Sequence, residues 1–282
     1  MLLPESFLGV LLALTSAVVW GGGDFSGGYA TRRNSQFQVL ALSALSGMVI
    51  LVAAAVVWQE ALPTSQSVLW AILAGIVGAA GIAALYHALS LGNIASAAPA
   101  SAVIGAALPV GFSTITRGMP TTAQLIGFIL AFGGIWMVSQ SNAENNKTSR
   151  QGFWLACLAG IGFGGFFILI AQVETTKVFI PLIIARVVAF CIAMFFLTVN
   201  RQSFPSPAAN PVAMLAGFLD AGGNVFYLLA RQFTRLDVAA VLSSFYPMVT
   251  VLLAGLLLKE KISRGQSLGI LLCLMAIILI TI

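Results

Sequence analysis

The stretch GFLDAGGNVFYLLAR, residues 217–231, lies inside an apolar run of the length, about 20 residues, that crosses a bilayer core. Asp220, Asn224 and Tyr227 follow the i, i+4, i+7 spacing and therefore share one stripe of a helix. A carboxylate at mid-depth costs about 2.5–3.5 kcal/mol, so this stripe should face protein or a watery cavity rather than lipid. We interpret it as a functional site; the alternative is a structural Asp220 that a neighbouring helix satisfies.

The composition is that of an integral membrane protein. Hydrophobic residues make up 60% of the chain and charged residues 7%, which excludes an ordinary soluble domain. The net charge of +5 is scattered over short loops, so no nucleic-acid partner is expected. The three cysteines lie in apolar stretches, with neither a disulfide framework nor metal-ligand spacing. Nucleophilic triads, phosphate-binding loops and zinc motifs are missing, so we predict no enzyme, no metal and no cofactor.

Ten apolar spans can be drawn along the chain, and all are predicted to be helices because backbone groups in lipid must be satisfied within their own segment. The longest polar stretch lies in the middle of the chain. We therefore divide the chain into a first five-helix repeat at 1–140, a polar linker at 141–151 and a second five-helix repeat at 152–282. The predicted spans are about 7–30, 36–58, 68–91, 94–116, 120–139, 152–172, 178–199, 211–231, 236–258 and 262–282.

The two halves repeat one another. GVLLALTSAVVWGGGDF at 9–25 aligns with GFWLACLAGIGFGGFFI at 152–168, and later matches keep the same order. Because each half supplies an odd number of spans, the second half enters the membrane from the opposite side. Such an inverted repeat places a substrate site near mid-depth between the halves, with access alternating as one bundle rocks against the other. The aligned pairs are Gly9 and Gly152, Ala13 and Ala156, Gly21 and Gly164, Gly22 and Gly165, Gly81 and Gly222, Tyr86 and Tyr227, Gln124 and Gln266, and Gly127 and Gly269.

Four segments resemble a known family. They are WGGGDFSGGYA at 20–30, ALYHALSLG at 84–92, GFLDAGGNVFYLLA at 217–230 and VAAVLSSFYPMVTVLLAGLLLKEKIS at 238–263. Together they resemble the ten-helix, EamA-like branch of the drug/metabolite transporter superfamily, over essentially the whole chain. The resemblance implies two four-helix-plus-one bundles that export or import small organic solutes. One departure is Thr116-Arg117-Gly118, where that family often has Gly-Glu.

Four ionisable side chains fall within spans: Asp24, His87, Arg186 and Asp220. With side A defined as the side of the N-terminus, a rise of 1.5 Å per residue puts Asp220 near the centre and Arg186 about 4 Å toward A, so the two can meet. Asp24 and His87 fall about 8 and 12 Å toward the opposite side, B. Arg186 is either a structural partner of Asp220 or an anchor for a substrate carboxylate or phosphate.

Asp24 lies among five glycines within eight residues, which weaken the helix and admit a close neighbour. Helix packing explains some of these glycines, but a bent helix beside a carboxylate is also typical of transporter sites. The repeat partner of Asp24 is Phe167, so only one half carries the acid. If transport is coupled to protons, Asp24 is a better carrier than His87, with Asp220 next, because Arg186 holds Asp220 ionised. A lone His87 is more often an interfacial residue than a proton relay.

Aromatic and hydroxyl side chains complete the candidate site. Trp20, Tyr86, Tyr227 and Tyr246 are candidate aromatic walls, although aromatics in membrane helices usually only pack or form interfacial belts. Ser243 and Ser244 precede Pro247, which frees a backbone carbonyl, so their hydroxyls can satisfy that carbonyl or line a cavity.

These features predict a secondary transporter of a small organic solute such as a metabolite, an amino-acid-like compound or a drug. The alternatives are a passive facilitator or exchanger of the same fold, and a membrane scaffold or intramembrane enzyme. We expect a monomer in a bacterial inner membrane, with protons as the candidate coupling ion. Side A carries Arg117, Lys177, Arg231 and Arg235, fewer cations than side B, which by the positive-inside rule puts the termini outside, whereas the resemblance implies cytoplasmic termini.

Overall fold

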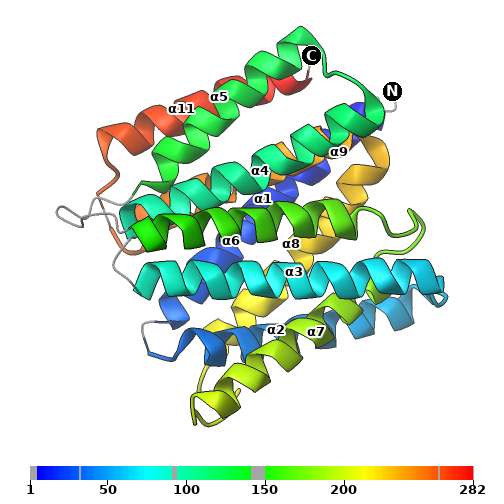
Figure 1. The fold of residues 1–282 in the computed structure, drawn as a ribbon, viewed down its shortest axis with the longest axis vertical. Helices are drawn as coiled ribbons and strands as arrows, with labels where there is room; N and C mark the ends of the chain where they lie inside the picture. The colour runs from blue at the N-terminus through cyan, green and yellow to red at the C-terminus, as the bar shows by residue number, and fades with distance from the viewer. Residues whose placement is uncertain (1–4, 32, 91–93, 141–149, 260, 282) are drawn as a thin grey trace.

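The computed structural model describes residues 5–31, 33–90, 94–140, 150–259 and 261–281, with backbone alone for 5–6, 86–90 and 94–99. These residues form helices joined by short connections (Figure 1). The first half contains α1 (Glu5–Ala30), α2 (Gln36–Val57), α3 (Ser65–Ser90), α4 (Ile94–Arg117) and α5 (Thr122–Ser139). The second half contains α6 (Arg150–Ile170), α7 (Phe179–Val199), α8 (Pro211–Phe233), α9 (Leu236–Ser243), α10 (Tyr246–Leu257) and α11 (Arg264–Thr281).

The all-helical prediction is confirmed. Within the part of the chain that the structure describes, nine segments are long and apolar enough to cross a membrane, and α9 with α10 counts as one of them. Helix α4, with side chains described only from Ala100, packs among them against α5, α6 and α9. The edges of the predicted linker at 141–151 stay a prediction, because residues 141–149 lie outside the described ranges.

The ninth predicted span, 236–258, is not the single helix that was expected. A turn at Ser244 and Phe245 divides it into α9 and α10. Pro247 is the cause, since it has no N–H to donate to the preceding turn. The backbone N–H of Ser244 donates to the carbonyl of Ala240 at 2.9 Å, and the Ser244 hydroxyl donates to the same carbonyl at 2.7 Å. These bonds cap α9 at the break, so the chain crosses the membrane as two short helices in sequence.

The helices pair across the two halves in a reciprocal pattern. Helix α1 packs on α8, the third helix of the second half, and α6 packs on α3, the third helix of the first half. In the same way α4 packs on α6, while α9 and α10 pack on α1; α2 pairs with α7 and α5 with α11. Exchanging the halves leaves this scheme unchanged. The arrangement is that of an inverted repeat. The most extensive helix contacts join the two halves rather than helices of one half.

Close helix crossings rest on glycine. A Cβ built on Gly162 of α6 would lie 2.6 Å from the Cα of Gly81 of α3. A Cβ on Gly223 of α8 would overlap the indole ring of Trp20 on α1. Small residues that let backbones approach are the usual solution in membranes, where lipid is as apolar as the helix surface. Trp20 is therefore held directly against α8, one turn from Asp220.

The two ends of the described chain lie at one end of the bundle. Helix α1 begins and α11 ends at the right of Figure 1, the end that we call side A. The last helix of each half starts with a matching capping box. Gln124 exchanges two hydrogen bonds with Thr121 at the start of α5, and its aligned partner Gln266 does the same with Ser263 at the start of α11. The repeat therefore extends to local hydrogen bonding.

Candidate functional site

The predicted pairing of Arg186 with Asp220 is confirmed. The Nη2 atom of Arg186, on α7, forms an ion pair with Oδ2 of Asp220, on α8. Gly47 on α2 lies beside the pair and lets α2 approach α8 closely, since a Cβ there would lie 2.9 Å from the Gly217 carbonyl oxygen. Arg186 is buried, whereas the Asp220 side chain is 40% exposed. The pair thus joins α7 to α8 beside α2, and the Asp220 side chain stays partly accessible.

Asn224 and Trp20 surround the same turn of α8. The amide nitrogen of Asn224 donates to the Asp220 carbonyl at 2.7 Å and lies 3.5 Å from Asp220 Oδ1. The Trp20 indole N–H donates to the same carbonyl at 3.2 Å. The Oδ1 atom of Asn224 is buried and has no hydrogen-bond partner among the described residues. The partly exposed Asp220 carboxylate is therefore an acceptor open to a donor such as a hydroxyl or ammonium group, and the Asn224 amide oxygen is a second acceptor that is enclosed in this conformation.

An aromatic cluster, formed by Trp20, Phe167 and Tyr227, lies on the side-A flank of this site. The ring centroids are 5.5 Å apart for Trp20 and Phe167, 6.0 Å for Trp20 and Tyr227, and 4.8 Å for Phe167 and Tyr227. Tyr227 is fully buried and donates from its hydroxyl to the Phe167 carbonyl at 3.0 Å. Since α8 runs toward side A, Tyr227 lies about 10 Å beyond Asp220 in that direction. The cluster thus packs α1, α6 and α8 against one another.

Asp24 lies on the other flank of the site. Its side chain is exposed, and it interacts electrostatically with Asp220 and with the Tyr246 hydroxyl. Tyr246 also contacts the Trp20 ring, at 6.5 Å between centroids. The side chains of Tyr86 and His87 lie outside the described residues. The layer that Asp24 was predicted to share with His87 thus stays a prediction, while Asp24 does approach the Arg186–Asp220 pair.

Ser243 and Ser244 serve helix packing in this structure. Both are buried. Ser243 donates to the Ala13 carbonyl on α1 at 3.3 Å, and Ser244 donates within its own turn. Their predicted participation in substrate binding stays a prediction, with the two hydroxyls committed to backbone carbonyls here.

Sequence reasoning missed three contributors. Phe167 completes the aromatic cluster, and the only signal in the sequence was that it aligns with Asp24 in the repeat. Ser16 joins α1 to α8 through the Gly223 carbonyl at 2.8 Å. Thr250 joins α10 to α1 through the Gly21 carbonyl at 3.1 Å. The two hydroxyl residues sit in apolar runs, where nothing local distinguishes a bridging hydroxyl from an incidental one.

The chain is similar to a known family and to known proteins. The profile of the EamA-like transporter family matches it twice, over residues 7–140 and 150–282. A provisionally named ribose uptake protein, RbsU of Lactobacillus johnsonii, is 26% identical over 223 residues, 73% of this chain and 75% of that protein. An uncharacterised protein of Methanocaldococcus jannaschii is 29% identical over 135 residues, 47% of this chain and 97% of that protein.

A solved crystal structure shares the fold, with a TM-score of 0.76 over 96% of this chain and 95% of the other at 16% identity. The paired family matches agree with the two repeated halves and with the resemblance noted in the sequence. The family and the RbsU relative are named for transport rather than for catalysis. The chain belongs to the EamA-like transporter family and is an integral membrane transporter.

Proposed function

We propose that this protein is a secondary transporter that binds a small polyhydroxylated solute, such as a pentose sugar, between its two halves. The observation that carries the proposal is the acceptor pair formed by the Asp220 carboxylate and the unpartnered Asn224 Oδ1, beside the indole of Trp20. Sugar hydroxyls donate to carboxylate and amide oxygens, and sugar rings pack on aromatic faces. The ribose uptake protein among the relatives favours the same class of solute.

The proposed mechanism is alternating access in a bacterial cytoplasmic membrane. On this proposal the aromatic cluster is the closure toward side A, and the partly exposed Asp220 carboxylate is reached from side B, the flank on which Asp24 lies. A rocking movement of one half against the other would open side A and close side B. The chain has no nucleotide-binding motif, so the driving force is a gradient of the solute itself or of protons.

Transport in proteoliposomes tests the solute. Purified protein should take up radiolabelled ribose saturably, and Asp220→Asn should reduce the initial rate by about tenfold or more, because an ionised acceptor is replaced by a weaker one. Glu174→Gln is the control, since this loop acid on side A lies away from the site and should transport normally. Equal uptake by wild type and Asp220→Asn would contradict the assignment. A panel of sugars, amino acids and amines identifies the solute if ribose is not carried.

Proton coupling separates a secondary active transporter from a passive facilitator of the same fold. With an imposed pH gradient, the wild type should accumulate solute above its equilibrium level. Asp24→Asn should lose this accumulation and keep solute exchange, because Asp24 is near Asp220 but carries no recorded ion pair among the described residues. Accumulation that persists in Asp24→Asn removes Asp24 from the coupling role. A wild type that only equilibrates solute is a facilitator.

A further inference from the structure

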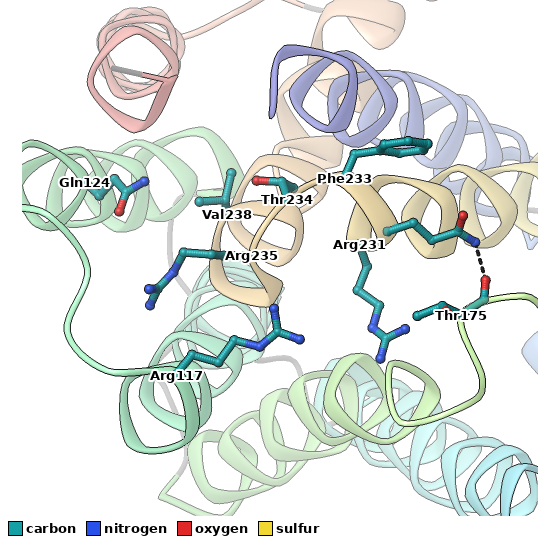
Figure 2. A pocket seen from close by; sticks show the side chains of 9 residues that line it. Arg117, Gln124, Thr175, Arg231, Phe233, Thr234, Arg235 and Val238 are labelled. Carbon is teal, nitrogen blue, oxygen red and sulfur yellow. Dashed lines mark hydrogen bonds between the residues drawn. The ribbon is translucent and has the colours of Figure 1, made fainter. Parts of the chain in front are cut away.

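Three arginines surround a pocket on side A, apart from the mid-membrane site. Its volume is about 550 Å³, within the range of small-molecule sites. Arg117 comes from the last turn of α4, Arg231 from the last turn of α8, and Arg235 from the junction before α9, so both halves contribute (Figure 2). The lining contains no acidic residue; it consists of Arg117, Gln124, Thr175, Arg231, Gln232, Phe233, Thr234, Arg235 and Val238.

Arg235 already has hydrogen-bond partners within the protein. Its Nη2 and Nε atoms bind the carboxylate of the fully buried Asp237, at 2.9 and 3.1 Å. Its Nη2 also donates to the Gly118 carbonyl at 2.9 Å, which ties the α4–α5 connection to the start of α9. The hydrogen bond to Asp237 raises the pKa of Arg235, so this arginine stays cationic. Arg235 forms a fixed wall of the pocket.

Arg117 and Arg231 have no such partner in the described part of the chain. Neither forms a recorded ion pair or side-chain hydrogen bond there, and the two guanidinium groups interact with one another as like charges. Each lies at a helix C-terminus, where the dipole supplies about half a negative charge. That offsets only part of two full charges, and Arg231 is only half-exposed. The local electrostatics therefore favour an anion between the two groups.

The pocket is separated from the Asp220 site by the aromatic cluster. Arg231 follows Asp220 by 11 residues on the same face of α8, about 16 Å along the helix axis, with Tyr227 between them. Figure 2 shows Arg117 reaching from α4 toward α9 while Arg231 extends away from α8. A ligand here would bind at the side-A approach to the transporter without touching Asp220.

We infer that this pocket binds an oxyanion, a carboxylate or phosphate group, through the guanidinium groups of Arg117 and Arg231. The volume exceeds that of inorganic phosphate, so the group belongs either to a soluble organic anion or to the headgroup of an anionic lipid at the membrane edge. The inference does not depend on which solute occupies the mid-membrane site.

Binding is measured on protein in nanodiscs of phosphatidylcholine alone, titrated with inorganic phosphate at constant ionic strength by isothermal calorimetry. A parallel preparation contains phosphatidylglycerol without phosphate, and native mass spectrometry counts the retained anionic lipid. The variants are Arg117→Gln, Arg231→Gln and their combination, with Lys177→Gln as a control that removes one positive charge on the same side outside the pocket lining. Each single variant keeps one of the two guanidinium groups, so the single variants alone can test the inference if the double variant does not fold.

Saturable phosphate binding that weakens about tenfold in each single variant and persists in Lys177→Gln supports a soluble anion, one tenfold step corresponding to about one charged hydrogen bond. Selective retention of phosphatidylglycerol that is lost in the same variants supports a lipid headgroup. The inference is overturned if neither anion is bound by the wild type, or if Lys177→Gln weakens binding as much as the pocket variants do. Ribose uptake is measured separately, so failure of the two proposals can be told apart.

Discussion

At the scale of single residues, the Arg186–Asp220 pair shows how much a sequence can reveal about depth. Helical rise along two predicted spans placed the two charges at nearly the same level, and the structure joins them. The prediction that this stripe of α8 faces protein is also met at two of its residues, since Tyr227 packs against Trp20 of α1 and the Asp220 carboxylate pairs with Arg186 of α7. Which aromatic rings close over that face was not readable, because Trp20 and Phe167 meet only after α1, α6 and α8 pack together.

Removing one partner of this pair should destabilise the protein. Arg186→Leu leaves Asp220 without its counterion, and we expect a loss of about 3 kcal/mol, the lower end for a buried pair because Asp220 is 40% exposed. The double variant Arg186→Leu/Asp220→Asn should recover most of that loss. Thermal unfolding in detergent, followed by intrinsic fluorescence, measures the three melting temperatures. A double variant that melts no higher than Arg186→Leu would refute an energetic coupling between the two residues.

A second residue-scale prediction concerns Gly223. A methyl group there overlaps the Trp20 ring, so Gly223→Ala must displace the ring that donates to the Asp220 carbonyl. We expect about 1–3 kcal/mol of destabilisation from overpacking and a marked loss of uptake. Gly133→Ala is the matched control, because a Cβ at that helix position meets nothing within 4 Å. If both variants melt alike, the Gly223–Trp20 contact does not constrain the α1–α8 crossing.

At the scale of elements, composition and periodicity predicted nearly every span, and the ends of the helices agree within three residues apart from the divided ninth span. That span remained apolar on both sides of Pro247, so hydropathy alone gave no reason to divide it. The division depends on whether neighbouring helices satisfy the freed backbone groups, which is a tertiary property. The start of α7 was predicted to within one residue, but the residue that caps it could not be predicted, because the cap is distant in the sequence.

Glu60 is that cap, and it joins the two halves on side A. Its carboxylate accepts the backbone N–H groups of Val178, Phe179 and Ile180 at 2.7 to 3.0 Å, where the α7 dipole is positive. Glu60→Ala should therefore cost about 1–3 kcal/mol, because three donors lose their acceptor. Hydrogen exchange of the Val178, Phe179 and Ile180 amides should rise locally.

Glu174→Ala is the comparison for this cap. The Glu174 carboxylate accepts one longer bond, 3.3 Å from the Thr64 N–H, so its removal should change the melting temperature by much less. Unchanged protection of the α7 amides in Glu60→Ala would show that water replaces the carboxylate without loss.

At the scale of the whole molecule, the repeat relates each residue of the aromatic cluster to an aligned residue in the other half. Trp20, Phe167 and Tyr227 align in the repeat with Phe163, Asp24 and Tyr86. If the halves exchange roles during transport, a side-B closure would bring Asp24 into the place that Phe167 holds here. An acid in place of a phenyl ring would make that closure depend on protonation of Asp24. This asymmetry gives a structural reason why proton coupling, if present, would act on one half of the cycle.

If the protein works by the proposed alternating access, we expect Tyr227 to influence which side is open. In the proposed cycle, the hydrogen bond from the Tyr227 hydroxyl to the Phe167 carbonyl would hold the side-A closure, and Tyr227→Phe removes that bond while keeping the ring. Loss of about 1 kcal/mol from the closed state shifts the ratio of closed to open molecules about fivefold. The readout is an Asn224→Cys probe, in a background without the three native cysteines, labelled by an impermeant thiol reagent applied from either side. Tyr227→Phe should label faster from side A and slower from side B, because opening one side closes the other. Faster labelling from both sides would mean a leak between the halves, and no change on either side would mean that the hydroxyl does not hold the closure.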